Sequence, residues 1–167
     1  MGKPAYHLVF LILSLALQSC GFALRGSDAI SANFSSLALN LQQPQSEFSR
    51  LLERSLEMAD VNISSSPDTS SDTIPTLAVA NERVSNRPVT INPRARAAQV
   101  EIRLSVDITL IRGELELIPA ETLLVDRVYF QDVENIAGNQ EEVQIITAEL
   151  RRELVNQLMR RLESAPQ

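Results

Sequence analysis

Hydrophobic and polar residues alternate most strictly between Ala98 and Leu110. Apolar residues occupy every second position, and polar residues fall between them: Val100, Ile102, Leu104, Val106, Ile108 and Leu110 against Glu101, Arg103, Ser105, Asp107 and Thr109. A period of two predicts a β-strand with one buried and one polar face. At about 3.3 Å per residue this strand would be on the order of 40 Å long. Arg112-Gly113 predicts a turn into a return strand that ends at Val128-Tyr129-Phe130, which makes a long hairpin.

Two other segments have the three- and four-residue spacing of amphipathic helices. The first covers residues 46–60, with Ser46 as N-cap, Glu47 in the first turn, and a stripe of Phe48, Leu51, Leu52, Leu56 and Ala59. The second runs from about Glu141 to Leu162, with a stripe of Val143, Ile146, Leu150, Leu154, Leu158 and Leu162. We interpret Arg151, Arg152, Arg160 and Arg161 as charges flanking that stripe, favoured near a helix C-terminus by the helix dipole.

The remaining pattern predicts shorter elements. We expect a strand over residues 34–41, a brief edge at Val61–Ile63, a loop over 64–72, a strand from Thr76 to Val84 and a loop over 134–140. Asn86-Arg87-Pro88 and Asn92-Pro93-Arg94 predict turns. Two amphipathic helices against one sheet give the α+β class.

The first residues have the layout of a bacterial secretion signal. Lys3 precedes an apolar run from Leu8 to Leu17, which is shorter than the ~20 residues of a membrane-spanning helix. Leu17-Gln18-Ser19-Cys20 resembles the lipobox of bacterial lipoproteins, with Gln18 an unusual residue for its position. We therefore predict that residues 1–19 are cleaved and that residues 20–167 form a single periplasmic domain anchored through Cys20.

Cys20 is the only cysteine, and the alternative is that it is a lone buried thiol. Its place directly after the apolar run favours lipidation, which also explains why it has no partner. The lipoproteins it resembles carry three acyl chains, so the expected group is an N-palmitoyl, S-diacylglycerol cysteine. Gly21 is not the aspartate that tends to retain such proteins in the inner membrane, so it indicates sorting to the outer membrane.

Charge and side-chain chemistry restrict the classes of function that this chain can have. The net charge of −6 becomes −7 when the leader leaves with Lys3, its only charged residue, and an acidic chain is a poor nucleic-acid binder. The leader also carries the only lysine and the only histidine, so the mature chain has no amine or imidazole side chain for catalysis. We expect no enzyme, no metal and no cofactor beyond the lipid. The enzyme alternative is a lipid-anchored hydrolase with a buried carboxylate pair, for which Asp126 and Asp132 are the nearest candidates.

Three stretches together resemble the LptE family of lipopolysaccharide-assembly lipoproteins. They are Cys20-Gly21-Phe22-Ala23-Leu24-Arg25-Gly26, the hairpin from Ala98 to Phe130 with the following Gln131-Asp132, and the helix end Gln157-Leu158-Met159-Arg160-Arg161-Leu162. The resemblance covers essentially the whole mature chain. It implies two amphipathic helices packed on one face of a four-stranded mixed or antiparallel sheet.

The resemblance also implies a function. It predicts an outer-membrane lipoprotein on the periplasmic face that plugs the LptD β-barrel, assists its assembly and helps to deliver lipopolysaccharide to the outer leaflet. The polar face of the long strand suits a barrel lumen. The alternative is an accessory lipoprotein of another envelope lipid-transport or barrel-assembly complex.

Lipopolysaccharide carries phosphates, and every side-chain cation left after cleavage is arginine, whose planar fork pairs with phosphate. Arg94 and Arg96, just before the long strand, are our first candidates for that contact. The alternative is that they are solvated loop charges. Some family members carry a lysine in the stretch that here reads Glu134–Gln140, and this chain has no cation there.

Overall fold

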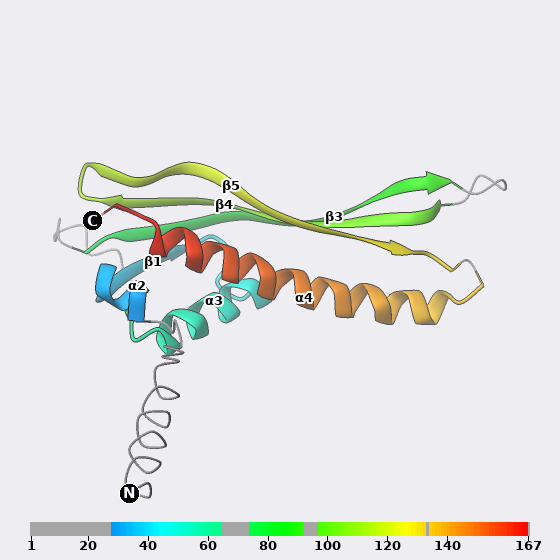
Figure 1. Ribbon diagram of the computed structural model, residues 1–167, viewed down its shortest axis with the longest axis horizontal. Helices are drawn as coiled ribbons and strands as arrows, with labels where there is room; N and C mark the ends of the chain where they lie inside the picture. Colours follow the sequence, from blue (N-terminus) through cyan, green and yellow to red (C-terminus); the bar gives the residue numbers. More distant parts are fainter. Residues whose placement is uncertain (1–27, 65–73, 92–96, 133, 167) are drawn as a thin grey trace, which may run out of the picture.

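The computed structural model describes residues 28–64, 74–91, 97–132 and 134–166. Their elements, in chain order, are α2 (Asp28–Asn33), β1 (Ser36–Leu41), α3 (Glu47–Met58), β2 (Asn62–Ser64), β3 (Thr76–Ile91), β4 (Ala97–Arg112), β5 (Leu115–Phe130) and α4 (Ile136–Glu163). The three helices of the described residues lie on one side of the sheet, and α4 runs along the long strands (Figure 1). The α+β class is therefore confirmed, with α2 as an additional short helix that the sequence pattern did not predict.

The sheet in the described part of the chain has five strands in the order β2-β1-β3-β4-β5, so the expected count of four was wrong. β1 pairs in parallel with β2 and β3, and the long strands pair antiparallel, which makes the sheet mixed. The additional strand is the brief edge anticipated near Val61–Ile63. It is fixed by Asn62, whose backbone and side-chain N–H groups both donate to the carbonyl oxygen of Ser35, at 3.0 and 3.1 Å.

β3 is longer than predicted, because Asn86-Arg87-Pro88 lies inside the strand and is not a turn. β1 pairs with β3 only as far as Val79, so the later residues of β3 form a free edge of the described sheet. A proline is tolerated on such an edge, since its missing N–H removes no bond from a second neighbour. A bulge between Ala80 and Arg83, with Asn81 at φ 53°, marks the point where β1 ends.

The apolar stripes predicted from the sequence form one core between sheet and helices. The apolar side of β4 is buried from Val100 to Leu110, and Ile102, Leu104, Val106 and Leu110 have no exposed surface. The stripe of α4 meets it with Ile146, Leu150, Leu154, Leu158 and Leu162, and α3 contributes Phe48, Leu52 and Leu56. This burial is the main force that holds the helices on one face of the sheet.

α4 begins at Ile136, five residues before the expected start, so most of the predicted loop over 134–140 is helical. Asn135 caps the helix, because its side-chain oxygen accepts from the Gly138 N–H at 3.0 Å. Asn139 reaches back from the first turn, accepting from the Asp132 N–H at 3.0 Å and donating to the Asp132 carbonyl oxygen. These local bonds start the helix in a segment that contributes no apolar residue to the buried stripe. The apolar periodicity therefore did not predict this first part of the helix.

Gly138→Ala is expected to lower the free energy of unfolding by about 1 kcal/mol, the typical contribution of an N-cap. A Cβ at Gly138 would overlap the Asn135 side-chain amide, so the cap would have to move. In an Asn135→Ala background the same substitution should be neutral or stabilising, because the obstacle is gone and alanine favours helix. Urea unfolding of the four chains measures this, and equal effects of Gly138→Ala in both backgrounds would contradict it.

Candidate functional site

The residues predicted to carry function lie outside the described residues. These are Cys20, Gly21, Arg94 and Arg96. The described chain begins at Asp28, and β3 and β4, which flank the two arginines, end at Ile91 and begin at Ala97. The predictions for these four positions are therefore neither confirmed nor contradicted by the structure.

The described residues instead present a broad polar surface on the sheet face that carries none of the described helices, which we call the open face (Figure 1). It contains the predicted polar side of β4. The strand register places residues of β3 and β5 beside it. On β3, Ser85 pairs with Arg103 and Arg87 pairs with Glu101. On β5, Thr122 pairs with Asp107, Leu124 with Ser105, Asp126 with Arg103 and Val128 with Glu101. The open face thus spans three long strands.

Glu101 is the centre of an ion cluster on the open face. Its carboxylate accepts from Arg87 Nε at 2.5 Å and Nη2 at 3.0 Å, and Arg103 Nη2 lies 3.2 Å from Oε2. These neighbours leave the residue only 6% exposed although none of the described helices covers it. The hydrogen bond from Arg87 lowers the pKa of Glu101 and raises that of Arg87, so both groups stay charged.

Asp107 joins the same three strands further along the open face. Its carboxylate accepts from the Thr122 hydroxyl at 2.6 Å and from Asn81 Nδ2 at 2.7 Å. Both hydrogen bonds lower the pKa of Asp107, with that from Thr122 the larger cause. Asn81 is held in turn by Gln42, whose side-chain oxygen accepts from its backbone N–H at 2.7 Å. The polar groups of the open face are therefore fixed in place before any partner arrives.

The folded state is expected to lose stability in acid through these two carboxylates. Both pKa values are lowered, so their contribution is complete above the ordinary values of 4.5 for Glu101 and 3.8 for Asp107 and falls as the pH drops through the lower folded-state values. The melting temperature of Glu101→Gln should therefore fall less than that of the wild type between about pH 6 and pH 3. Glu57→Gln, an exposed α3 position, is the control and should follow the wild type. Identical profiles for all three chains would contradict the assignment.

The open face also carries an apolar row along β5 that sequence analysis missed. Leu124, Val128 and Phe130 are 39%, 46% and 73% exposed. In the sequence they lie within a run that is apolar on both faces in places, so their side of the sheet became evident only from the register with β4. Exposed apolar side chains in a row are typical of surfaces that meet a partner.

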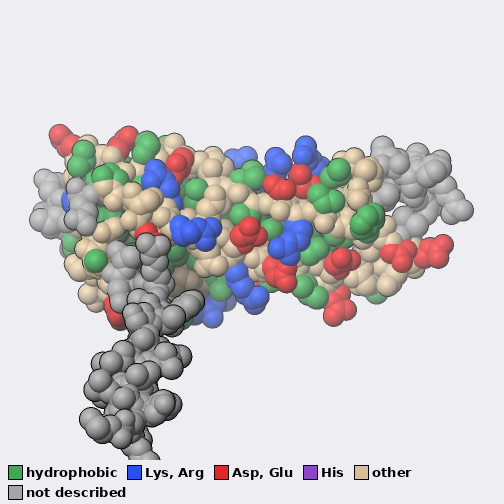
Figure 2. All heavy atoms as spheres, viewed as in Figure 1, with side chains coloured by type: hydrophobic (Ala, Val, Ile, Leu, Met, Phe, Trp, Pro, Cys, Tyr) green, Lys and Arg blue, Asp and Glu red, His purple; other side chains and the backbone are tan. Residues whose placement is uncertain are grey.

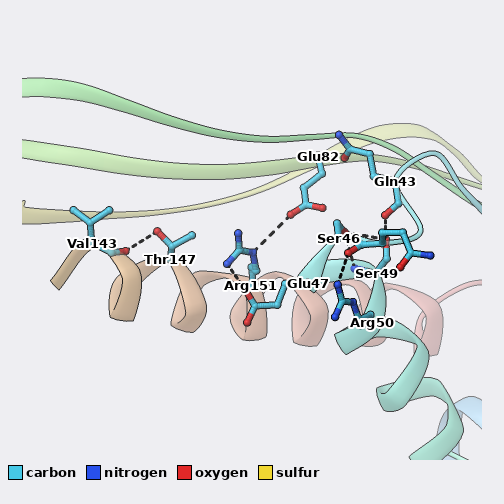
Figure 3. A network of polar contacts seen from close by, with 10 residues as sticks. Gln43, Ser46, Glu47, Ser49, Arg50, Glu82, Val143, Thr147 and Arg151 are labelled. Carbon is cyan, nitrogen blue, oxygen red and sulfur yellow. Dashed lines mark hydrogen bonds and ion pairs between the residues drawn. The ribbon is translucent and has the colours of Figure 1, made fainter. Parts of the chain in front are cut away.

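Ion pairs on the other side of the sheet hold α4 in position. Arg151 of α4 lies 2.6 Å from Glu47 at the start of α3 and 3.7 Å from Glu82 of the β3 bulge (Figure 3). Arg161 pairs with Glu121 of β5 at 2.6 Å, and Arg127 of β5 pairs with Glu149 of α4. Arg151 and Arg161 therefore flank the apolar stripe, as predicted, and also join separate elements.

A cavity of about 580 Å³ opens between the end of β5 and the start of α4. Tyr129, Ile136 and Val143 give it apolar walls, and Gln131, Asn139 and Gln140 add amides. Because Phe130 pairs with Gln99, this cavity lies at the end of the hairpin where β3 stops and β4 begins. Its lining suits an apolar group that carries hydrogen-bonding substituents.

The carboxylates proposed for a hydrolase do not form a buried pair. Asp126 is exposed on the open face, opposite Arg103. Asp132 is exposed beyond β5, where it accepts from the Glu134 N–H at 2.9 Å. Within the described ranges, acidic, histidine and cysteine side chains form no group of three that could hold a metal ion. In the same ranges every helix is too short or too polar to cross a membrane.

Comparison with known proteins identifies relatives over most of the chain. Residues 34–162 match the family model for LptE, described as lipopolysaccharide-assembly. The LPS-assembly lipoproteins LptE of Pectobacterium atrosepticum and Photorhabdus laumondii are each 26% identical to this chain over 160 residues. The alignments cover 94% of this chain and 85% and 86% of those proteins.

Solved structures share the fold at lower identity. The crystal structure of rare lipoprotein B from Shewanella oneidensis superposes with a TM-score of 0.68 at 17% identity, covering 77% of this chain and 94% of that one. A minor lipoprotein from Acinetobacter baumannii gives 0.62 at 17% identity, covering 80% of this chain and 97% of that one. The arrangement of sheet and helices is therefore one that other lipoproteins adopt.

Proposed function

The chain belongs to the LptE lipopolysaccharide-assembly family, and we propose that it is an outer-membrane lipoprotein that plugs the LptD β-barrel and helps to deliver lipopolysaccharide to the outer leaflet. The observation that carries this proposal is the family match, which runs from just before β1 into the last turn of α4. Proteins of this family are not enzymes, so the prediction that the chain has no catalytic activity is confirmed.

The open face supports the plug arrangement. A plug inside a barrel needs a rigid outer surface that is polar enough to meet a hydrated lumen, and the clusters at Glu101 and Asp107 provide fixed charges and hydrogen-bonding groups. The row of Leu124, Val128 and Phe130 adds apolar contact area. At about 3.3 Å per residue, β4 extends for roughly 50 Å, which suits a tall lumen. We therefore place the barrel wall against the open face.

Photo-crosslinking tests this placement. A photoreactive amino acid at Ser105 or Thr122, both on the open face, should crosslink to LptD in intact cells. The side chain of Ser105 is half-buried and that of Thr122 is exposed, and neither side chain is part of the buried core. The same amino acid at Leu154, which is fully buried, is the control and should give no crosslink. Absence of LptD crosslinks from both open-face positions would contradict the placement.

Cys20 is the proposed lipid attachment site, with Gly21 directing the protein to the outer membrane and the domain hanging on the periplasmic face. The relatives named above are lipoproteins, which supports this assignment. No separate cofactor enters the proposal, because the covalent lipid supplies the membrane attachment.

The proposed lipopolysaccharide contact is at Arg94 and Arg96, which come in the chain between the end of β3 and the start of β4. Arg94 and Arg96 would pair with phosphates of lipid A or the core, since a guanidinium fork binds phosphate in a bidentate manner. The cavity between Tyr129 and Ile136 lies at the end of the hairpin where β3 stops and β4 begins, and it has an apolar wall that an acyl chain could contact. Together they give an amphiphile both a charged and an apolar contact.

A further inference from the structure

The opposite end of the molecule holds a small polar pocket that the proposed function does not use. Its volume is about 270 Å³, and it lies where α2 ends, β1 and β3 begin and β4 stops. Asn33, Ser35, Ser36 and Arg112 line it together with Phe34 and Pro75. A water molecule occupies about 30 Å³, so the pocket has room for a small anion and the group attached to it.

Arg112 is the cation of this pocket, and its surroundings differ from those of the paired arginines. It follows Leu110 by two positions on β4, so it lies on the helix-facing side of the sheet. Its Nε is buried without a hydrogen-bond partner, as are those of Arg103 and Arg151, but Arg112 forms no ion pair with the rest of the described chain. By contrast Arg87, Arg103, Arg127 and Arg151 all lie within 4.0 Å of a carboxylate.

Among the described residues that line this pocket Arg112 is the only charged one, so its guanidinium gives the pocket a positive charge that an anion there would neutralise. Glu116 is paired with Ile111 in the register and so lies on the open face, away from the pocket. Hydrogen bonds to residues outside the pocket hold its walls in place. Asn33 donates to the Glu163 carbonyl oxygen at 2.9 Å, and the Ser35 carbonyl oxygen accepts from the backbone and side-chain N–H groups of Asn62. The geometry is therefore preformed around Arg112.

We propose that this pocket binds a phosphate group, with the guanidinium of Arg112 as its charged partner and the hydroxyls of Ser35 and Ser36 as further donors. Phosphate offers enough oxygens to accept from a guanidinium fork and two hydroxyls at once, and charge-assisted bonds of this kind are the strong ones. The group comes either from a phospholipid headgroup or from free phosphate.

The headgroup source rests on the proposed anchoring at Cys20. Eight residue steps separate Cys20 from Asp28, so at most about 28 Å of chain joins a membrane anchor to α2, next to the pocket. Phosphate binding itself does not depend on the anchor. If association with LptD were disproved, the proposal that this pocket binds phosphate would still stand. If phosphate binding were disproved, the proposed function at LptD would still stand.

The test is a titration of the mature chain, purified in a phosphate-free non-ionic detergent, followed through the Arg112 Nε–Hε signal in NMR spectra. One arm uses inorganic phosphate and the other uses short-chain dihexanoyl phosphatidylglycerol below its micellar concentration. We expect saturable shifts, with tighter binding in the phospholipid arm if the headgroup is the source and equal binding if free phosphate is. Absence of saturation in both arms would overturn the proposal.

Two substitutions of Arg112 and one control substitution make the test specific, with affinities followed by calorimetry. Arg112→Gln should weaken binding about tenfold or more, because the charge-assisted bonds are lost. Arg112→Lys, which keeps the charge without the fork, should weaken it less and serves if the first variant unfolds. Arg160→Gln, an exposed position near the end of α4, is the matched control and should bind as the wild type does. Equal affinities for Arg112→Gln and Arg160→Gln would overturn the assignment of Arg112.

Discussion

Cys20→Ala is expected to release the protein from the membrane almost completely while leaving the domain folded. Among the described residues the buried core begins at Ile30, so the substitution removes the proposed tether and changes no packing within the described core. Each buried CH₂ of an acyl chain contributes about 0.8 kcal/mol to membrane binding, and two or more chains make attachment stable. Fractionation of cells that lack LptD, with circular dichroism of the released protein, measures both parts of the expectation.

Gly21→Asp is the matched control for this experiment. It keeps the cysteine and its lipid but changes the residue that we assign to sorting, so the protein should stay membrane-bound and shift toward the inner membrane. If the Cys20→Ala chain still fractionated with outer membranes in cells without LptD, the anchoring proposal would fail. An unmodified Cys20 thiol in mass spectra of the wild-type protein would have the same consequence.

Arg94→Glu combined with Arg96→Glu is expected to weaken lipopolysaccharide binding by a factor of ten to about a hundred. Each substitution replaces a cation that attracts phosphate with an anion that repels it. Association with LptD should remain nearly unchanged, because the open face, where we place the barrel wall, is made of other residues of the sheet. Retention of lipopolysaccharide by the purified protein and recovery of LptD are the two readouts.

The matched control changes the same number of charges on α3. Arg50 and Arg54 donate only to backbone carbonyls in the described structure, so Arg50→Glu with Arg54→Glu breaks no described ion pair. This variant should retain lipopolysaccharide at the wild-type level. Equal retention by both double variants and the wild type would instead mean that Arg94 and Arg96 are solvated loop charges.

Local patterns in the sequence predicted the large elements well. The strict alternation of β4 and the apolar stripes of α3 and α4 each repeat many times, and burial against a common core follows directly from them. β2 was anticipated as a brief edge but was not counted as a strand of the sheet, because three residues are too few to show alternation and its pairing depends on Ser35, far away in the sequence. Pro88 indicated a turn, whereas its place on a free edge allows it to remain within a strand.

The candidate site was harder to predict because its contacts join residues that are distant in the sequence. The alternation of β4 placed Glu101 and Asp107 on the polar face, but it could not show that Arg87 and Thr122 would be their partners. Those partners depend on the register of β3 and β5, which bulges shift by one residue. The pocket at Arg112 likewise requires four elements to meet, and no local signal marks it.

The most direct test of the proposed function is the identity of the protein that copurifies with this chain from detergent-solubilised outer membranes. We expect LptD in a one-to-one complex that survives gel filtration. Recovery of a barrel-assembly subunit or of a lipid-transport partner, with no LptD, would contradict it.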